Sequence, residues 1–294
     1  DIKEGHRKTG SDIQVSDVCR PHMYSLLPDC RMSRREHYST ALAKSQGIVS
    51  ETISLFEIWQ PGMSSNDLFK VVHSTNALNL DSELRLRDVT NQGFGSRFLR
   101  EPYLSVAETL KEIFTSCKDH TFLKQLSLLY AMRQHGIFFD FLTDEYWPSV
   151  RSGGHSIRTS DIQLLIDRGL VSGRLDKNWS ESMRKRVSSY VLGIATDFDL
   201  LTASRSGDRP IATWSLHDSL ALYLTYDLHF MGASDDEVAN SEEWRALGLQ
   251  REDVTLYLNR LQNKGHLIAQ DTGHLCRIDW KYSSREELTH VLIY

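Results

Sequence analysis

The chain has 294 residues, of which 40% are hydrophobic. Such a chain can bury a core, which excludes a protein that is disordered along most of its length. No apolar run approaches the roughly 18 residues that span a bilayer, and no two cysteines form a Cys-x-x-Cys pair. We therefore expect a cytoplasmic protein with no membrane partner, no metal and no cofactor. The net charge of −5 disfavours nucleic-acid binding by the chain as a whole, but not by a locally basic face.

The first 36 residues are polar and show no periodicity. We expect residues 1–36 to form an N-terminal extension, either a tag or a flexible segment, with Met23 and Met32 as alternative native starts. The first periodic stretch follows. Between Thr40 and Trp59 the apolar residues partly keep helical spacing, and the turn residues at 60–62 end that helix.

Helix starts are marked along the chain by a serine followed three residues later by an acid or an amide. This pair can satisfy two free backbone donors of a first helical turn. The pairs are Ser64 with Asp67, Ser105 with Glu108, Ser160 with Gln163, Ser234 with Glu237, and Ser284 with Glu287. Strand signals are few and short. The chain is predicted to be mainly α, a helical protein with helix-turn-helix and winged-helix-like units and short β-hairpin wings.

We predict an N-terminal helical domain over residues 37–110, a central domain over 111–215 and a C-terminal domain over 216–294. In the first, a helix pair at 64–78 and 82–99 is helix-turn-helix-like but lacks a following hairpin. Its second helix places Arg85, Arg87 and Arg97 as candidate phosphate contacts.

The segment 160–214 has the order helix, turn, helix, hairpin. Ser160 should begin a helix that ends at Gly169, and Ser180 should begin the second helix. The hairpin is predicted from strands around 200–204 and 210–214. Segment 151–209 holds ten basic and seven acidic residues, a local charge of +3. The candidate DNA contacts are Arg184, Lys185 and Arg186 on the second helix, with Arg205 and Arg209 on the wing.

The segment 234–280 repeats this order. A helix should run from Ser234 to about Leu247, and another from about Arg251 to Lys264, with Gly265 at its C-cap. Amide, hydroxyl and cationic side chains on the outward face of the second helix suit base edges and phosphates. They are Thr255, Asn259, Arg260, Asn263 and Lys264, and the wing adds His274 and Arg277. Segment 254–281 has a charge of +2, whereas 210–253 has −7.

Enzyme signatures are absent from the sequence. His217-Asp218 invites comparison with metal phosphohydrolases, with His155, Asp227 and His229 as further ligands, but their spacing follows no metal-binding pattern. His217 fits better as a residue at a helix N-terminus or an interface. The glycine pairs at 93–95 and 153–154 lack the context of a dinucleotide site or a P-loop, and no Gly-x-Ser-x-Gly elbow occurs. We expect no enzymatic activity.

Four stretches resemble, in order, the BrxA-like family of BREX phage-exclusion systems. They are HYSTALAKSQGIVSETISLFEIWQPGMSSNDLFKVV (37–72), RLRDVTNQGFGSRFL (85–99), LSLLYAMRQHGIFFDFLTDEYW (126–147) and WSESMRKRVSSYVLGIATDFDLL (179–201). The resemblance implies a small, mainly helical, non-enzymatic component with winged-helix character that binds DNA and is encoded beside a methyltransferase and ATPases. Residues 215–294 are less typical of the family, so the role of the final hairpin rests on its pattern alone.

These observations leave three hypotheses open. The first is a DNA-binding accessory component of a BREX-type defence system that contacts mainly phosphates. The second is a protein-protein adaptor for other BREX components, because helix-hairpin modules also bind proteins and a charge run is usually a solvated face. The third is a sequence-specific repressor, with the amide-rich face of the helix at 251–264 reading bases.

Overall fold

The computed structural model describes residues 37–44, 47–204, 207–272 and 275–294. The helical elements, in chain order, are η1 (Thr40–Lys44), α2 (Val49–Ile58), α3 (Ser65–Thr75), α4 (Glu83–Arg87), the π-helical η2 (Asp88–Gly95), α5 (Ser96–Phe98), η3 (Leu104–Val106), α6 (Ala107–Ser116), α7 (His120–Gln134), α8 (Gly136–Phe141), the π-helical η4 (Leu142–Tyr146), α9 (Trp147–Arg151), α10 (Thr159–Val171), α11 (Glu181–Asp197), α12 (Asp218–Phe230), α13 (Asp235–Ala239), α14 (Glu242–Ala246), α15 (Arg251–Asn263) and α16 (Arg285–Ile293). The strands are β1 (Ser156–Arg158), β2 (Asp208–Pro210), β3 (Leu267–Asp271) and β4 (Cys276–Trp280). The prediction of a mainly α protein with short hairpins is confirmed.

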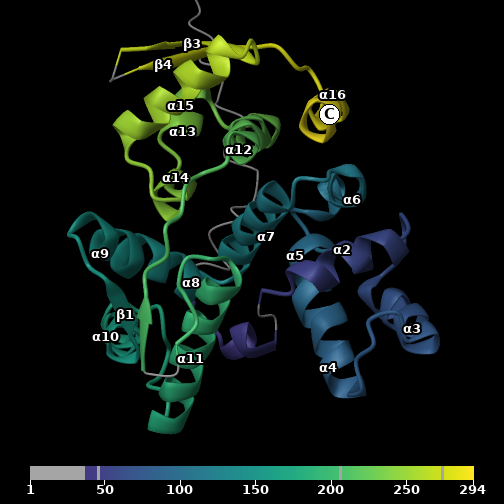
Figure 1. Ribbon diagram of the computed structural model, residues 1–294, viewed down its shortest axis with the longest axis vertical. Helices are drawn as coiled ribbons and strands as arrows, with labels where there is room; N and C mark the ends of the chain where they lie inside the picture. The colour runs from purple at the N-terminus through teal and green to yellow at the C-terminus, as the bar shows by residue number, and fades with distance from the viewer. Residues whose placement is uncertain (1–36, 45–46, 205–206, 273–274) are drawn as a thin grey trace, which may run out of the picture.

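Helix α7 is the centre of the molecule. It contacts α2 and α5 toward the N-terminal helices, α8 toward the central ones, and α12 toward the C-terminal ones, and Figure 1 shows these groups arranged around it. The predicted stripe of Phe122, Leu126, Leu129 and Tyr130 is buried. Most of the other α7 side chains are buried as well, because neighbours cover the helix on several sides.

A buried ion network joins α7 to the C-terminal helices. The Arg133 guanidinium donates two hydrogen bonds to Glu243, at 3.1 and 2.7 Å, and one of 2.8 Å to Asp227. Arg285 contacts the other carboxylate oxygen of Asp227. The Arg133 side chain has no exposed surface. Burial opposes the charged form of Arg133, but the two carboxylates outweigh it and raise its pKa well above the ordinary value.

Helix starts were predicted correctly where the serine cap forms. Ser64, Ser180, Ser234 and Ser284 each accept a hydrogen bond from the backbone N–H three residues later. The prediction at Ser105 was wrong, because this hydroxyl donates to the Pro102 carbonyl and α6 begins only at Ala107 after a 3-10 turn.

Helix α10 differs from its prediction at both ends. It begins at Thr159 rather than after Ser160, and the Arg158 N–H donates to the Asp161 carboxylate. It also continues through Gly169 to Val171. Gly169 is needed for packing instead of termination, since a Cβ there would lie 2.3 Å from the ring of Tyr38. The predicted helix from Thr40 to Trp59 is likewise divided, into η1 and α2.

The central unit, which we define as residues 156–212, contains an unpredicted strand. Strand β1 precedes α10 and pairs antiparallel with β2, which follows α11. The expected pairing between 200–204 and 210–214 is reduced to an isolated bridge between Leu201 and Ile211. The order in space is therefore β1, β2 and then the stretch around Leu201, with α10 and α11 packed together beside them.

The C-terminal unit, residues 235–280, contains the predicted hairpin of β3 and β4. Its first helix was wrongly predicted as continuous, because α13 ends at Ala239 and α14 starts at Glu242. Gly248 and Gly265, both at positive φ, follow α14 and α15 as expected. Both outer edges of the hairpin are engaged: the Ala269 N–H donates to Gln262, and the Ile278 N–H donates to Asp235.

Within the described ranges, no helix combines the length and the apolar character that a membrane crossing requires.

Candidate nucleic-acid interface

Helix α11 presents one continuous outward face. At 100° per residue, positions 182, 186, 189 and 193 form one stripe along the side opposite the buried Val187, Val191 and Ile194. Ser182, Lys185, Arg186 and Ser189 are exposed, and a Cβ added at Gly193 would meet nothing within 4 Å. The face therefore combines two cations with small residues, and its N-terminal end carries Glu181, which pairs with Lys185.

The three adjacent cations of α11 have different surroundings. Arg184 lies on the inner side, where it binds Asp167 of α10 at 2.6 Å and the Gln163 carbonyl at 3.1 Å. Its side chain is only 16% exposed, so it ties α11 to α10 and is not a free DNA contact. Its prediction as a DNA contact is therefore corrected.

Lys185 and Arg186 stay on the outer surface. Lys185 forms an i,i+4 pair with Glu181, which is 81% exposed, and this pair lowers the pKa of the Glu181 carboxyl. Exposed pairs of this type contribute at most about 1 kcal/mol, so a phosphate can replace the carboxylate. Arg186 is exposed and has no side-chain partner within the described part of the chain.

The wing side of the central unit is partly anchored to α11. Arg209 donates to the Leu192 carbonyl at 3.0 Å and to the Thr196 hydroxyl. It therefore holds β2 against the C-terminal half of α11. The other predicted wing contact, Arg205, lies outside the described residues.

The predicted reading face of α15 is engaged within the C-terminal unit. Thr255 donates to Asp271 on β3, which also receives two hydrogen bonds from Arg251. Arg260 and Lys264 both bind Asp218 of α12, at 2.8 and 2.6 Å, and these cations lower the pKa of the Asp218 carboxyl despite its partial burial.

The remaining outward surface of α15 is weakly suited to phosphates. It consists of Glu252, Leu256, Asn259 and Asn263, all exposed. Leu256 is 66% exposed, and Ile268 and Leu275 on the hairpin are 54% and 65% exposed. Arg277 on β4 is exposed without a partner among the described residues, and His274 lies outside them. This surface is mainly apolar and amide-bearing, with one acid and one cation.

The arginines predicted in the N-terminal helices separate into three environments. Arg97 is 1% exposed and donates to Gln134 and to the Gly47 carbonyl; it is a core residue, and its prediction as a DNA contact was wrong. Burial lowers the pKa of Arg97 to about 9, despite the nearby Asp197. Arg87 pairs with Glu83 at 2.9 Å. Arg85 is half-buried and lines a cleft.

The rejected metal-site candidates have structural roles. His217 is the N-cap of α12 and accepts from the Ser219 N–H, as expected for a helix N-terminal residue. Asp227 belongs to the buried ion network, and His229 stacks on Trp280 with ring centroids 3.9 Å apart. Among the described residues, no three His, Cys, Asp or Glu side chains are arranged to hold a metal ion.

The search for charged residues in the sequence found only part of the α11 face. Ser182, Ser189 and Gly193 were not singled out, because none of them is charged or a strong DNA contact by itself. A helical projection starting at Ser182 would have placed them beside Arg186, while the inward position of Arg184 follows from the same projection.

The fold defines a helical protein with two helix-hairpin units, of which the central one exposes cations and the C-terminal one exposes apolar and acidic side chains. The chain belongs to the BrxA family, whose sequence model matches residues 36–227. This match confirms the resemblance and implies a component of a BREX defence system.

A similar fold occurs in a solved structure, a crystal structure of an uncharacterized protein from Magnetospirillum magneticum. The two chains share 11% identity with a TM-score of 0.54, over 72% of this chain and 98% of the other. At this identity the likeness shows the fold alone. A search among curated proteins gives no match.

Proposed function

We propose that this protein is a cytoplasmic, non-enzymatic DNA-binding component of a BREX-type defence system, and that α11 of the central unit makes the contact. The observation that carries the proposal is the outward face of α11, where Arg186 and Lys185, the latter paired with the exposed Glu181, lie among small residues. Phosphate binding requires a local cationic surface of this kind, and the net charge of the whole chain matters less at the contact distance.

The order of elements supports the same assignment. In the central unit a strand precedes two helices, and the second helix is followed by two paired stretches. A winged helix has this order, and its second helix of the helix-turn-helix is the one that enters the major groove. Small residues on α11 would allow close approach of a nucleic-acid backbone.

Salt dependence tests this proposal quantitatively. If Lys185, Arg186 and about two further cations neutralise phosphates, log K should fall with a slope of about −3.6 against log salt, so affinity for duplex DNA should drop roughly 100-fold between 50 and 200 mM salt. Fluorescence anisotropy with a labelled duplex of mixed sequence would measure it. An affinity that is nearly constant over this range would contradict phosphate binding.

Two variants localise the contact. Arg186→Ala should reduce the salt slope by about 0.9 and weaken binding across unrelated sequences. Arg100→Ala is the matched control, because Arg100 is also exposed without a side-chain partner in the described chain but lies outside the central unit. If Arg277→Ala lowers DNA affinity as much as Arg186→Ala does, the C-terminal hairpin also contacts DNA.

A second candidate function is a protein-protein adaptor. It is favoured by the C-terminal unit, where Leu256, Ile268 and Leu275 are exposed and where residues 216–294 have seven basic and thirteen acidic residues, a net charge of −6. Leu256→Ser should then weaken capture of a purified defence component while leaving DNA retention unchanged. If Leu256→Ser abolishes DNA retention and leaves capture of the defence component intact, the adaptor function is contradicted.

The repressor hypothesis has less support. Its reader would be Thr255, Asn259 and Asn263, but Thr255 is hydrogen-bonded to Asp271 and faces the hairpin. Footprinting over the upstream promoter would test it through the presence of a discrete protected site.

A further inference from the structure

The start of the described chain is anchored at the turn between α10 and α11. The Tyr38 N–H donates to the Arg174 carbonyl at 2.7 Å, and the Tyr38 hydroxyl donates to the Asp140 carboxylate at 2.7 Å. The ring lies against Gly169, and only 8% of Tyr38 is exposed. The helix η1 that follows packs against α11, and Figure 1 shows it, in purple, beside that helix. The residues just before Tyr38 are therefore held beside the turn that leads into α11.

The N-terminal end of α11 and the turn before it carry only a small positive charge. Arg184 is already paired with Asp167 and is set aside. The other charged residues within 176–186 are three cations and two carboxylates, a net charge of +1. They are Lys177, Lys185 and Arg186 against Asp176 and Glu181, all exposed. A contact with about four phosphates therefore needs further cations near this end.

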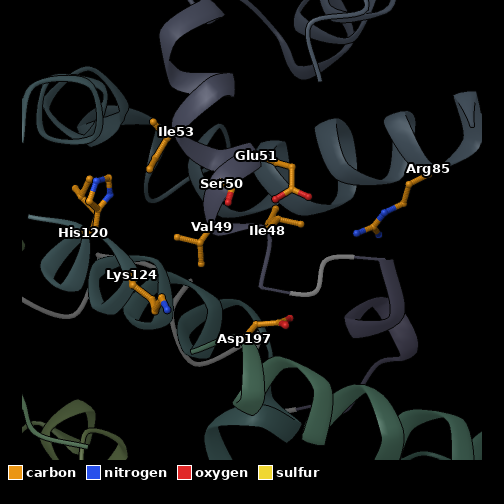
Figure 2. Close-up of a pocket in the computed structure, with 10 residues that line it drawn as sticks. Ile48, Val49, Ser50, Glu51, Ile53, Arg85, His120, Lys124 and Asp197 are labelled. Atoms are coloured by element: carbon orange, nitrogen blue, oxygen red, sulfur yellow. The ribbon is translucent and has the colours of Figure 1, made fainter. Parts of the chain in front are cut away.

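The C-terminal end of α11 does not supply these cations. Asp197 lies on the wall of a cleft of about 470 Å³ (Figure 2), and Asp199 just beyond it pairs with Lys124 at 2.5 Å. The cleft has no net charge from its lining lysine, arginine and acidic side chains, which are Arg85 and Lys124 against Glu51 and Asp197. DNA should therefore approach α11 from its N-terminal end, the end of a recognition helix that contacts base edges.

Residues 31–36, which precede the described chain and which we call the arm, are basic. They contain three arginines and one glutamate, a net charge of +2. A chain advances at most about 3.6 Å per residue, so in any conformation the Cα atoms of Arg34 and Arg35 lie within about 11 Å of the His37 Cα. His37 lies beside the turn, with Nδ1 3.7 Å from the Asp176 carboxylate. The arm therefore raises the charge near this end of α11 from +1 to +3.

We infer that the arm makes a second DNA contact, in which Arg34 and Arg35 bind phosphates of the duplex next to the part that α11 occupies. The inference rests on the proposed function and names the further cations that this function needs. Homeodomains use an arginine-bearing N-terminal arm in a comparable way, in the groove adjacent to the one that the recognition helix enters. Because Tyr38 ties the arm to the turn before α11, its arginines meet the bound duplex at a high effective concentration.

Fluorescence anisotropy of the full chain with a labelled duplex of mixed sequence tests the inference. Arg34→Gln combined with Arg35→Gln removes two phosphate contacts, so the slope of log K against log salt should change from about −3.6 to about −1.8. Affinity should then fall only about 12-fold between 50 and 200 mM salt, instead of roughly 100-fold. Arg34→Lys combined with Arg35→Lys keeps both charges and should keep the slope and the affinity.

Arg7→Gln combined with Lys8→Gln is the matched control. It removes two adjacent charges from the same N-terminal stretch, but at positions 29 or more residues before His37. The Tyr38 anchor does not hold those positions near α11, so the slope should stay close to about −3.6. If the two pairs of glutamine substitutions change the slope equally, net charge and not placement governs binding, and the inference is overturned.

The same measurements separate this inference from the proposed function. If the chain without substitutions does not bind the duplex, both are wrong. If Arg186→Ala weakens binding while the glutamine pair at positions 34 and 35 leaves affinity and slope unchanged, only the arm contact is excluded, and α11 binds DNA without it. The lysine pair changes the same two positions, so its unchanged affinity excludes a folding defect as the cause of the loss in the glutamine pair.

Discussion

We expect substitution of the buried Arg133 to lower the stability of the fold more than most other substitutions. Its guanidinium is fully buried and binds Asp227 and Glu243, and Arg285 also contacts Asp227. Arg133→Met keeps much of the side-chain volume but removes the cation that the buried carboxylates of Asp227 and Glu243 both contact. Removing one partner of a buried ion pair typically costs about 3–5 kcal/mol.

The expected loss is large enough for a simple assay. A decrease of about 4 kcal/mol in the free energy of unfolding corresponds to a Tm roughly 10 °C lower in a chain of this size. Urea denaturation followed by circular dichroism would give the free energy directly. Lys124→Met provides the matched control, because it breaks the pair with the 67%-exposed Asp199 and should cost no more than about 1 kcal/mol.

A double variant examines the cause. Replacing Glu243 with Leu in the Arg133→Met background removes one of the two buried carboxylates, and it should recover part of the lost stability, since apolar replacement of a buried pair is often nearly neutral. The reasoning is refuted if Arg133→Met costs no more than Lys124→Met, or if the second change lowers stability further.

Three other predictions concern local environments. Gly169→Ala should destabilise by about 1–3 kcal/mol, because its Cβ would lie 2.3 Å from Tyr38, whereas Gly193→Ala, in open space within α11, should stabilise by about 0.5–1 kcal/mol; equal effects in urea unfolding would contradict this. Burial raises the pKa of Cys276 to about 11, so alkylation at pH 8, followed by mass spectrometry, should be roughly 100-fold slower than at an ordinary thiol, and rapid native labelling would disprove it. Burial also raises the pKa of the Asp140 carboxyl. The contribution of this carboxyl to the free energy of unfolding is therefore present below its pKa in the unfolded chain, and it is lost as pH rises through its pKa in the folded protein. Asp140→Asn should therefore reduce the difference between the free energies of unfolding at about pH 4 and pH 7, and an unchanged difference would contradict this prediction.

Local signals predicted the fold better than the site. The caps at Ser64, Ser234 and Ser284 are made within four residues of sequence, so the sequence contains their whole cause. Strand β1 has only three residues and pairs with β2 across more than 45 intervening residues, so periodicity could not reveal it. The same limit applies to β2 on the wing side, because its pairing partner β1 precedes α10.

The candidate site was predicted in part. The exposed position of Arg186 follows from helical spacing, which a sequence contains. Arg97 was misjudged because its partner, Gln134, lies 37 residues away, and the pairing of the exposed Arg260 with Asp218, 42 residues away, was likewise not visible in the sequence. A sequence shows that a cation is present, but only tertiary packing shows whether another part of the chain has already neutralised it.

The hairpin of β3 and β4 is a poor template for strand addition. The Gln262 and Asp235 side chains each occupy a backbone donor on one outer edge, so an incoming peptide would have to displace the side chain on the edge that it joins before it could extend the sheet. Recognition through the side chains of this hairpin is therefore favoured over strand addition, and it is open to redesign by substitution at Ile268 or Arg277 while the strand register is preserved.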